Sequence, residues 1–182
     1  MIIVAVDPGA THTGIVVAEF DRVTSMDGKI LDQETILRDN PIDSYLPVDN
    51  NYLQRVRIAV SSFCHTFEPD AFGIECVERP SWFVGGKAKP TNPEPIIATA
   101  VVMGIALAVG LEELGRAQTY QIPVGGNGAG AFVSYPAVLV SNKERAQPNW
   151  QMKQAGKGKH CHERSAYDVA VQTVRTIRRG KR

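Results

Sequence analysis

The sequence has few cysteines, no long apolar run and almost no net charge. Its three cysteines form no paired framework, and the N-terminus lacks the basic and then apolar pattern of a signal peptide. We therefore expect a reducing, intracellular setting. The longest predominantly apolar run without charge, residues 96–111, has 16 residues and contains two glycines, whereas a membrane-spanning helix needs about 20 residues. This run predicts a buried or interface helix.

The formal net charge of +1 conceals an uneven distribution of charge along the chain. Residues 142–182 carry 11 lysines and arginines against 3 acids, whereas residues 1–141 carry 9 against 16. A basic segment of this kind suits a phosphate backbone, because neutralising phosphates releases bound counterions. A solvated tail has the same composition, so the charge alone favours neither interpretation.

The length of 182 residues and the 43% apolar content predict one domain with a buried core. Runs rich in β-branched residues predict five strands, and apolar residues at helical spacing predict three helices. The predicted strands are 2–6, 14–20, 30–37, 71–77 and 118–124, and the predicted helices are 52–67, 96–114 and about 162–177. This order indicates an α/β fold: a five-stranded mixed sheet, three antiparallel strands and then parallel ones, flanked by helices.

Three acids lie at the ends of predicted elements that are far apart in the sequence. Asp7 ends the first strand before a Pro-Gly turn, Glu75 lies late in the fourth strand, and Asp168 lies in the first turns of the last helix. If the two strands are neighbours and the helix crosses their ends, the three carboxylates converge. Converging carboxylates repel unless a cation such as Mg²⁺ binds them. The alternatives are a turn-forming role for Asp7 and an exposed, helix-dipole role for Asp168.

Two stretches contain residues suited to binding nucleic acid. The Pro/Gly-rich loop 78–95 carries adjacent aromatics beside two lysines, and a polar basic arm, which we expect to be mobile, spans about 141–161 of a single domain covering 1–180. Aromatics stack on bases and cations hold phosphates, although an aromatic pair can also form a small core within its own loop. The candidate DNA-binding residues are Trp82, Phe83, Lys87, Lys89, Lys153, Lys157, Lys159 and Arg164.

The stretch of highest glycine density, residues 123–130, follows the last predicted strand. It lacks the Gly-Lys-Ser/Thr ending of a phosphate-binding loop and only approaches G-x-G-x-x-G. We therefore expect a flexible loop near a substrate.

Three short motifs, in order, resemble a known family. They are Asp-Pro-Gly-x-x-x-x-Gly from Asp7, Gly-Ile-Glu ending at Glu75, and Ser-Ala-x-Asp-Val-Ala from Ser165. Together they are similar to the RuvC-type Holliday junction resolvases of the ribonuclease H-like fold, over about residues 1–175. The resemblance implies a homodimeric endonuclease that cuts four-way DNA junctions with Mg²⁺ or Mn²⁺, two ions per site. The Ser-Ala-x-Asp version with a basic arm is most similar to phage-encoded members, which implies the cytoplasm of a bacterial or phage-infected cell.

The resemblance also assigns roles to residues. It implies that Asp7, Glu75 and Asp168 are catalytic metal ligands and that the fourth ligand position, normally an acid or histidine, falls on Ser165. His162 or Glu163 could substitute, and we favour His162, which could also act as a general acid or base. The family's junction-probing aromatic falls in the loop after the glutamate strand, and its dimer helix falls on residues 96–114.

Other functions are compatible with the same motifs. The chain could be a ribonuclease H-like nuclease for another branched DNA or an RNA–DNA hybrid, or a junction-binding protein without catalysis. The opening Asp-x-Gly-x-Thr-x-Thr-Gly pattern also fits the actin-like and sugar-kinase ATPases, in which Thr11 and Thr13 would contact phosphates. Those proteins use two such domains, and this chain has room for one.

Overall fold

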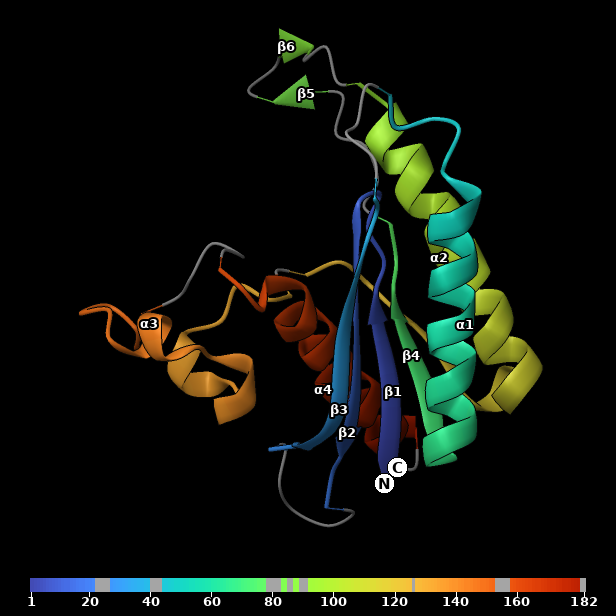
Figure 1. Cartoon of the computed structure of the whole chain (residues 1–182). Helices are drawn as coiled ribbons and strands as arrows, with labels where there is room; N and C mark the ends of the chain where they lie inside the picture. The colour runs from blue at the N-terminus through green and yellow to red at the C-terminus, as the bar shows by residue number, and fades with distance from the viewer. Residues whose placement is uncertain are drawn as a thin grey trace.

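The structure is a computed structural model, in which five strands form one mixed sheet (Figure 1). It describes residues 1–21, 27–39, 44–77, 83–84, 87–88, 92–125, 127–152 and 158–180. The strands are β1 (Ile2–Asp7), β2 (His12–Glu19), β3 (Lys29–Leu37), β4 (Ala71–Glu75) and β7 (Thr119–Ile122), in the spatial order β3-β2-β1-β4-β7. The first three strands pair antiparallel, and β4 and β7 continue the sheet parallel to β1. The predicted fold class is therefore confirmed.

The register of the two central strands places two of the predicted acids side by side. In the parallel pair of β1 and β4, Val6 lies opposite Ile74. The next residues along the two strands are Asp7 and Glu75, so both carboxylates project from the same carboxyl-terminal edge of the sheet. β1 is an unbroken apolar run because it is buried on both faces, as expected for a central strand.

Helices cover both faces of the sheet (Figure 1). α1 (Asn50–Phe67) and α2 (Glu94–Leu114) pack on one face, and α4 (Cys161–Gly180) packs on the other. Alternate residues of β1 therefore belong to different cores: Val4 and Val6 contact the side of α1 and α2, whereas Ile3 and Ala5 contact the side of α4. α4 thus spans the sheet with its N-terminal end near the edge that carries the acids.

α2 is longer than its uncharged run suggested. It has 21 residues, and an 18-residue stretch of it has a mean hydropathy of 2.0, so by length and composition it could cross a membrane; 28% of that stretch is buried. One side of α2, including Ala98, Val102 and Ala106, packs against the sheet and α1. The opposite side exposes Ile97, Val101 and Leu111.

A segment between β7 and α4 projects from the α4 side of the molecule. It contains two short 3-10 turns, η2 (Phe132–Ser134) and η3 (Ala137–Leu139), and the one-turn helix α3 (Asn142–Arg145). Ser141 and Glu144 form a capping box at the start of α3. The prediction of a mobile arm from residue 141 is therefore wrong for residues 141–152, because local capping and the burial of Glu144 fix this part. Residues 153–157 lie outside the described ranges.

The remaining described elements are short. η1 (Arg116–Gln118) connects α2 to β7, and β5 (Phe83–Val84) pairs antiparallel with β6 (Lys87–Ala88) in the loop after β4. The sequence indicated only a Pro/Gly-rich loop for this hairpin. Two-residue strands are too short to produce a recognisable alternation of apolar and polar residues.

Candidate active site

Asp7 and Glu75 are in contact at the carboxyl-terminal edge of the sheet. Their carboxyl groups share a hydrogen bond, and Glu75 is 8% exposed. Burial and, after it, the neighbouring Asp7 raise the pKa of Glu75 to about 8. The shared hydrogen bond requires a proton on one of the two groups. In the protein without metal, Glu75 therefore holds that proton at neutral pH.

Two polar side chains orient Glu75. The Asn127 amide donates to Glu75 Oε1 at 2.7 Å, and the Ser165 hydroxyl donates to Oε2 at 3.4 Å. The Gln172 amide donates in turn to Asn127 Oδ1, which fixes the orientation of the Asn127 side chain. Glu75 is thus held by the glycine-rich loop and by α4. This result agrees with the expectation that the loop lies near a site.

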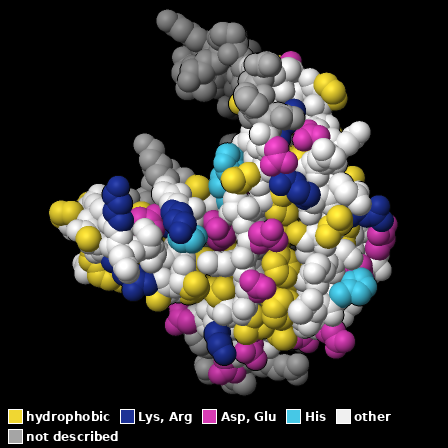
Figure 2. Space-filling model, in the orientation of Figure 1, with side chains coloured by type: hydrophobic (Ala, Val, Ile, Leu, Met, Phe, Trp, Pro, Cys, Tyr) yellow, Lys and Arg dark blue, Asp and Glu magenta, His cyan; other side chains and the backbone are white. Residues whose placement is uncertain are grey.

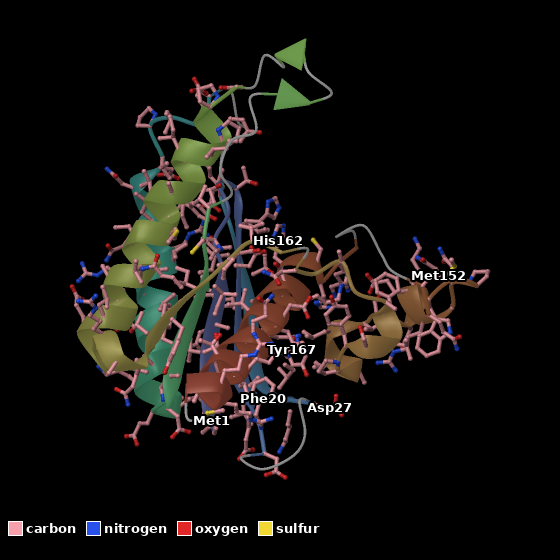
Figure 3. All side chains as sticks on the ribbon, turned by 180° about the vertical axis from the view of Figure 1, so that it is seen from behind. Met1, Phe20, Asp27, Met152, His162 and Tyr167 are labelled. Atoms are coloured by element: carbon pink, nitrogen blue, oxygen red, sulfur yellow. The ribbon has the colours of Figure 1, made fainter. Side chains whose placement is uncertain are left out.

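His162 lies on the open side of Asp7. Its Nδ1 is 3.1 Å from Asp7 Oδ2, and its ring stacks on the ring of His12 with a centroid distance of 5.0 Å and an interplanar angle of 11°. Burial and the neighbouring His162 lower the pKa of His12. Figure 3 shows His162 at the end of α4 that is nearest the acid-bearing edge of the sheet. His162 thus lies beside one of the predicted metal ligands, and its role as a fourth ligand or as a general acid or base stays a prediction.

Asp168 also contacts the glycine-rich loop, but its hydrogen-bond partners differ from those of Glu75. Its Oδ2 accepts hydrogen bonds from Gly128 N and from the Tyr135 hydroxyl, both at 2.8 Å. Burial raises the pKa of Asp168, although these two hydrogen bonds oppose the shift. Within the described part of the chain, no group of three or more His, Cys, Asp or Glu side chains is arranged to hold a metal ion. Asp7 and Glu75 are therefore in contact. Asp168 instead contacts Gly128, which follows Asn127 in the loop, and Asn127 contacts Glu75.

Two glycines allow α4 to lie close enough to position these groups. A Cβ atom at Gly14 would be 2.3 Å from the carbonyl oxygen of His162, and one at Gly73 would be 2.1 Å from Thr173 Oγ1. Such distances do not occur for real Cβ atoms, so any larger residue would push α4 away from the sheet. Gly14 sets the approach of the helix N-terminus to β2, and Gly73 sets its approach to β4.

Arg164 is not a DNA-binding residue, and that prediction is wrong. Its side chain is fully buried, pairs with Glu144 at 3.2 Å and donates to Leu139 O at 2.9 Å. The guanidinium also lies over the rings of Phe132 and Tyr135, at 4.8 and 5.8 Å from their centroids. Arg164 therefore fastens the projecting segment to α4. A buried charge that has all these partners cannot reach a phosphate.

The other predicted DNA-binding residues are only partly described. Lys159 is exposed, and the backbones of Phe83 and Lys87 lie in the β5–β6 hairpin. Trp82, Lys89, Lys153 and Lys157 lie outside the described residues. Figure 2 shows Lys and Arg side chains over the α3 projection, whereas acidic side chains dominate the centre of the same face.

Comparison with solved structures identifies the fold. Neither a protein-family model nor a curated protein sequence matches this chain. Thermus thermophilus RuvC in complex with a Holliday junction substrate superposes with a TM-score of 0.61 at 18% identity, covering 99% of this chain and 96% of that chain. Another structure of Thermus thermophilus RuvC gives 0.60 at 19%, with 99% and 97% coverage. The chain has the RuvC fold. It shares this ribonuclease H-like architecture over its whole length.

The donor set of the RuvC-fold site suits a hard divalent cation. Asp7 and Glu75 supply carboxylate oxygens, Ser165 supplies a hydroxyl, and no Lys or Arg side chain forms an ion pair with either acid among the described residues. Two ionised carboxylates in contact without a cation repel each other, and this repulsion adds to burial in raising the pKa of Glu75. A divalent ion would remove the repulsion through the oxygen ligands that Mg²⁺ and Mn²⁺ prefer. The residues therefore fit the metal.

Sequence reasoning missed three residues of the site. Asn127, Tyr135 and His12 contact Glu75, Asp168 and His162, respectively. Asn127 carries the one polar side chain within the run 124–130, which could have drawn attention to it. His12 begins β2, five residues after Asp7, so the sequence placed a second titratable group close to this acid. Nothing in the local sequence around Tyr135 indicates its contact with a residue 33 positions away.

Proposed function

We propose that the protein is a Mg²⁺- or Mn²⁺-dependent endonuclease that resolves four-way DNA junctions by paired phosphodiester hydrolysis. The observation that carries this proposal is the contact between Asp7 and the buried Glu75 at the carboxyl-terminal edge of a RuvC-fold sheet, with no Lys or Arg partner for either acid among the described residues. RuvC itself has been seen with a Holliday junction. The shared fold makes such a junction the first substrate to test.

The proposed metal site uses oxygen ligands from three parts of the chain. Asp7 and Glu75 would hold the ion, and Ser165 and Asp168 would complete the ligand set for a second one. A bound ion would activate a water molecule and stabilise the leaving oxygen of the phosphodiester. Asn127 and Ser165 hold Glu75 in place through hydrogen bonds. Tyr135 and Gly128 do the same for Asp168.

His162 is suited to proton transfer in the proposed reaction. The Asp7 carboxylate accepts at Nδ1, so the neutral imidazole carries its proton there and leaves Nε2 as the basic nitrogen. Nε2 can therefore take a proton from an attacking water. The stacked His12 ring restricts rotation of the His162 ring and disfavours a second positive charge beside it.

We also propose that the protein forms a homodimer through α2. Ile97, Val101, Gly104, Ala108 and Leu111 lie on its exposed side with alternating spacings of four and three residues. This is the heptad pattern by which two helices pack together. A Cβ atom at Gly104 would meet nothing within 4 Å, so a partner helix could approach closely there. Paired cutting of a symmetrical junction requires two active sites, which a dimer supplies.

The dimer interface makes a direct prediction. Replacing Val101 by Asp is expected to convert a dimer into a monomer, because the interface would bury an unpaired charge. Size-exclusion chromatography with light scattering measures the change. Ile58→Asp is the matched control, because Ile58 is an exposed apolar residue of α1 that lies outside this side of α2. A monomeric wild-type protein, or a Val101→Asp variant that remains dimeric, would contradict the proposed interface.

The function itself is tested by substrate choice. The wild-type protein is incubated with a labelled four-way junction, a linear duplex and an RNA–DNA hybrid, in Mg²⁺ and in Mn²⁺. We expect paired cuts in the junction and at least 10-fold slower cleavage of the other two. Preferential cleavage of the hybrid would instead support a ribonuclease H-like enzyme with another substrate. Junction binding without cleavage in either metal would show a binding protein.

The structure weakens the ATPase alternative. Thr13, which would contact phosphates in that reading, is fully buried, and its hydroxyl is 2.7 Å from the Tyr52 hydroxyl. The Tyr52 hydroxyl donates to Gly9 O, so it accepts from Thr13. Thr13 therefore ties the β1–β2 turn to α1 and has no free donor for a phosphate. Saturable ATP binding in a titration would revive this alternative.

A further inference from the structure

A cavity of about 330 Å³ adjoins Asp168 on the side away from Asp7. Its lining comes from the glycine-rich loop and from one side of α4, including Asn127, Gln172 and Arg175. This volume is at the lower end of the range for small-molecule pockets, about 300–1,000 Å³. Asp168, Val171, Gln172 and Arg175 line the cavity from successive turns of α4, so a longer ligand could extend out of it along this helix.

The α4 side of the cavity carries a row of polar residues that changes from acidic to basic. Asp168, Gln172, Arg175 and Arg179 have spacings of four, three and four residues, so they share one side of the helix. Asp168 lies nearest the candidate active site, Gln172 follows one turn later, and the two arginines lie closer to the C-terminal end of α4. Arg175 and Arg179 are both exposed.

These two arginines differ from most others in the chain. Arg55 pairs with Asp39, Arg57 with Glu112 and Arg164 with Glu144. Arg145 and Arg178 donate to backbone carbonyl groups.

Arg175 and Arg179, by contrast, make no hydrogen bond or ion pair with any other described residue. Arg175 is close enough to Asp168 to oppose the rise in its pKa electrostatically, but both guanidinium groups have donors available to an external anion. A guanidinium presents a planar set of donors that suits a phosphate group.

The spacing of the row fits a nucleic-acid strand. A helix rises about 1.5 Å per residue, which places Arg175 about 10 Å and Arg179 about 16 Å along the axis from Asp168. A strand that follows the helix therefore brings phosphates within a few nucleotides of the one beside Asp168 into reach of the two arginines.

We propose that the cavity and the two arginines form a track for the sugar-phosphate backbone of the cleaved strand. This inference rests on the proposed nuclease function, because it places the cleaved phosphate near Asp168. Asp168, at the acidic end of the row, lies beside the proposed metal site. Arg175 and Arg179, at the basic end, bind phosphates of the strand that leads away from this site. Residues Asn127, Gln172, Arg175 and Arg179 thus join the site as strand-positioning groups.

The test removes the two positive charges and measures binding without cleavage. A labelled four-way junction and a labelled single strand are titrated in EDTA with the wild-type protein and with Arg175→Gln/Arg179→Gln, at several NaCl concentrations. We expect affinity to fall about 3- to 10-fold at 100 mM NaCl and the slope of log K against log salt to decrease by about 2, one for each lost phosphate contact. Arg57→Gln is the control, because Arg57 is an exposed arginine of α1, across the sheet from α4.

A second measurement locates the contacts on the DNA. Uncharged methylphosphonates replace, one at a time, the five phosphates on each side of the cleaved bond. We expect replacements within one continuous stretch on one side to weaken binding by the wild-type protein but not by the double variant. If the double variant and Arg57→Gln have the same affinity and salt slope, the track is wrong, even where the wild-type protein cleaves junctions. If the wild-type protein cleaves nothing but the slope still decreases, the track is supported and the proposed reaction fails.

Discussion

Replacing Asp7 by Asn is expected to lower the rate of metal-dependent junction cleavage by more than about 100-fold while junction affinity in EDTA stays within a factor of two. The lower bound follows because replacing even a residue that only hydrogen-bonds to a metal ligand lowers metal affinity or activity by about 10- to 100-fold. Asn keeps the size of Asp7 and can still accept a hydrogen bond from His162 Nδ1, whose present distance is 3.1 Å. The fold and the DNA surface should therefore survive, and only the charge that attracts the ion is lost.

The matched control for this variant is Asp32→Asn. Asp32 is an exposed acid on the edge strand β3, with no contact to the site. Single-turnover cleavage of a labelled junction in Mg²⁺ and in Mn²⁺ compares the two variants with the wild-type protein. The control should cleave at the wild-type rate. Full cleavage by Asp7→Asn would falsify the assignment of Asp7 as a metal ligand.

Replacing Glu75 by Gln is expected to stabilise the metal-free protein at high pH. The pKa of Glu75 is raised from its ordinary value of 4.5 to about 8, so between these values the folded protein holds a proton that the unfolded chain has lost. The free energy of unfolding therefore falls as pH rises from about 4.5 to 8, and the loss is complete above pH 8. One pKa unit corresponds to about 1.4 kcal/mol, so this difference in pKa leads us to expect that Gln raises the free energy of unfolding by roughly 5 kcal/mol at pH 9.

Chemical denaturation of both proteins at pH 5 and pH 9 measures this effect. The gain should be large at pH 9 and small at pH 5, where the wild-type side chain is already protonated. Added Mg²⁺ should raise the melting temperature of the wild-type protein at pH 8 and leave that of Glu75→Gln unchanged, because ion binding requires the ionised carboxylate. If the variant were equally destabilised at both pH values, the result would show that the fold does not disfavour the ionised form of Glu75.

The sequence predicted the sheet and its three long helices because these elements depend on patterns that are local. β1 is a continuous apolar run, and α4 repeats its buried residues Ala166, Val169, Ala170 and Val174 at helical spacing. The β5–β6 hairpin and α3 were missed. α3 is a single turn that exists because of one capping box and the pairing of Glu144 with Arg164, a residue 20 positions later.

The site was predicted in outline for the same reason. Asp7 and Glu75 end apolar runs, so their strands alone were enough to suggest that they meet. Arg164 was misassigned because composition identifies a charge but not its burial, and its partner Glu144 lies in a polar stretch that gave no structural signal. The partners of Asp168 could not be predicted, because Tyr135 approaches it only after the projecting segment has folded back on α4.

The close packing of His162 against Gly14 has a consequence for how the protein is made. Asp7 and His162 are 155 residues apart, and ribosomes add about 5–20 residues per second, so synthesis of α4 begins roughly 8–30 s after β1 is complete. Until α4 is made, one face of the sheet lacks its covering helix, and Ile3, Ala5 and Val16 lack most of the side chains that they pack against. A nascent or prematurely terminated chain thus lacks both His162 and Asp168 and exposes a surface that chaperones bind. The ability to cut DNA would arise only with the last helix, after the rest of the domain has been made.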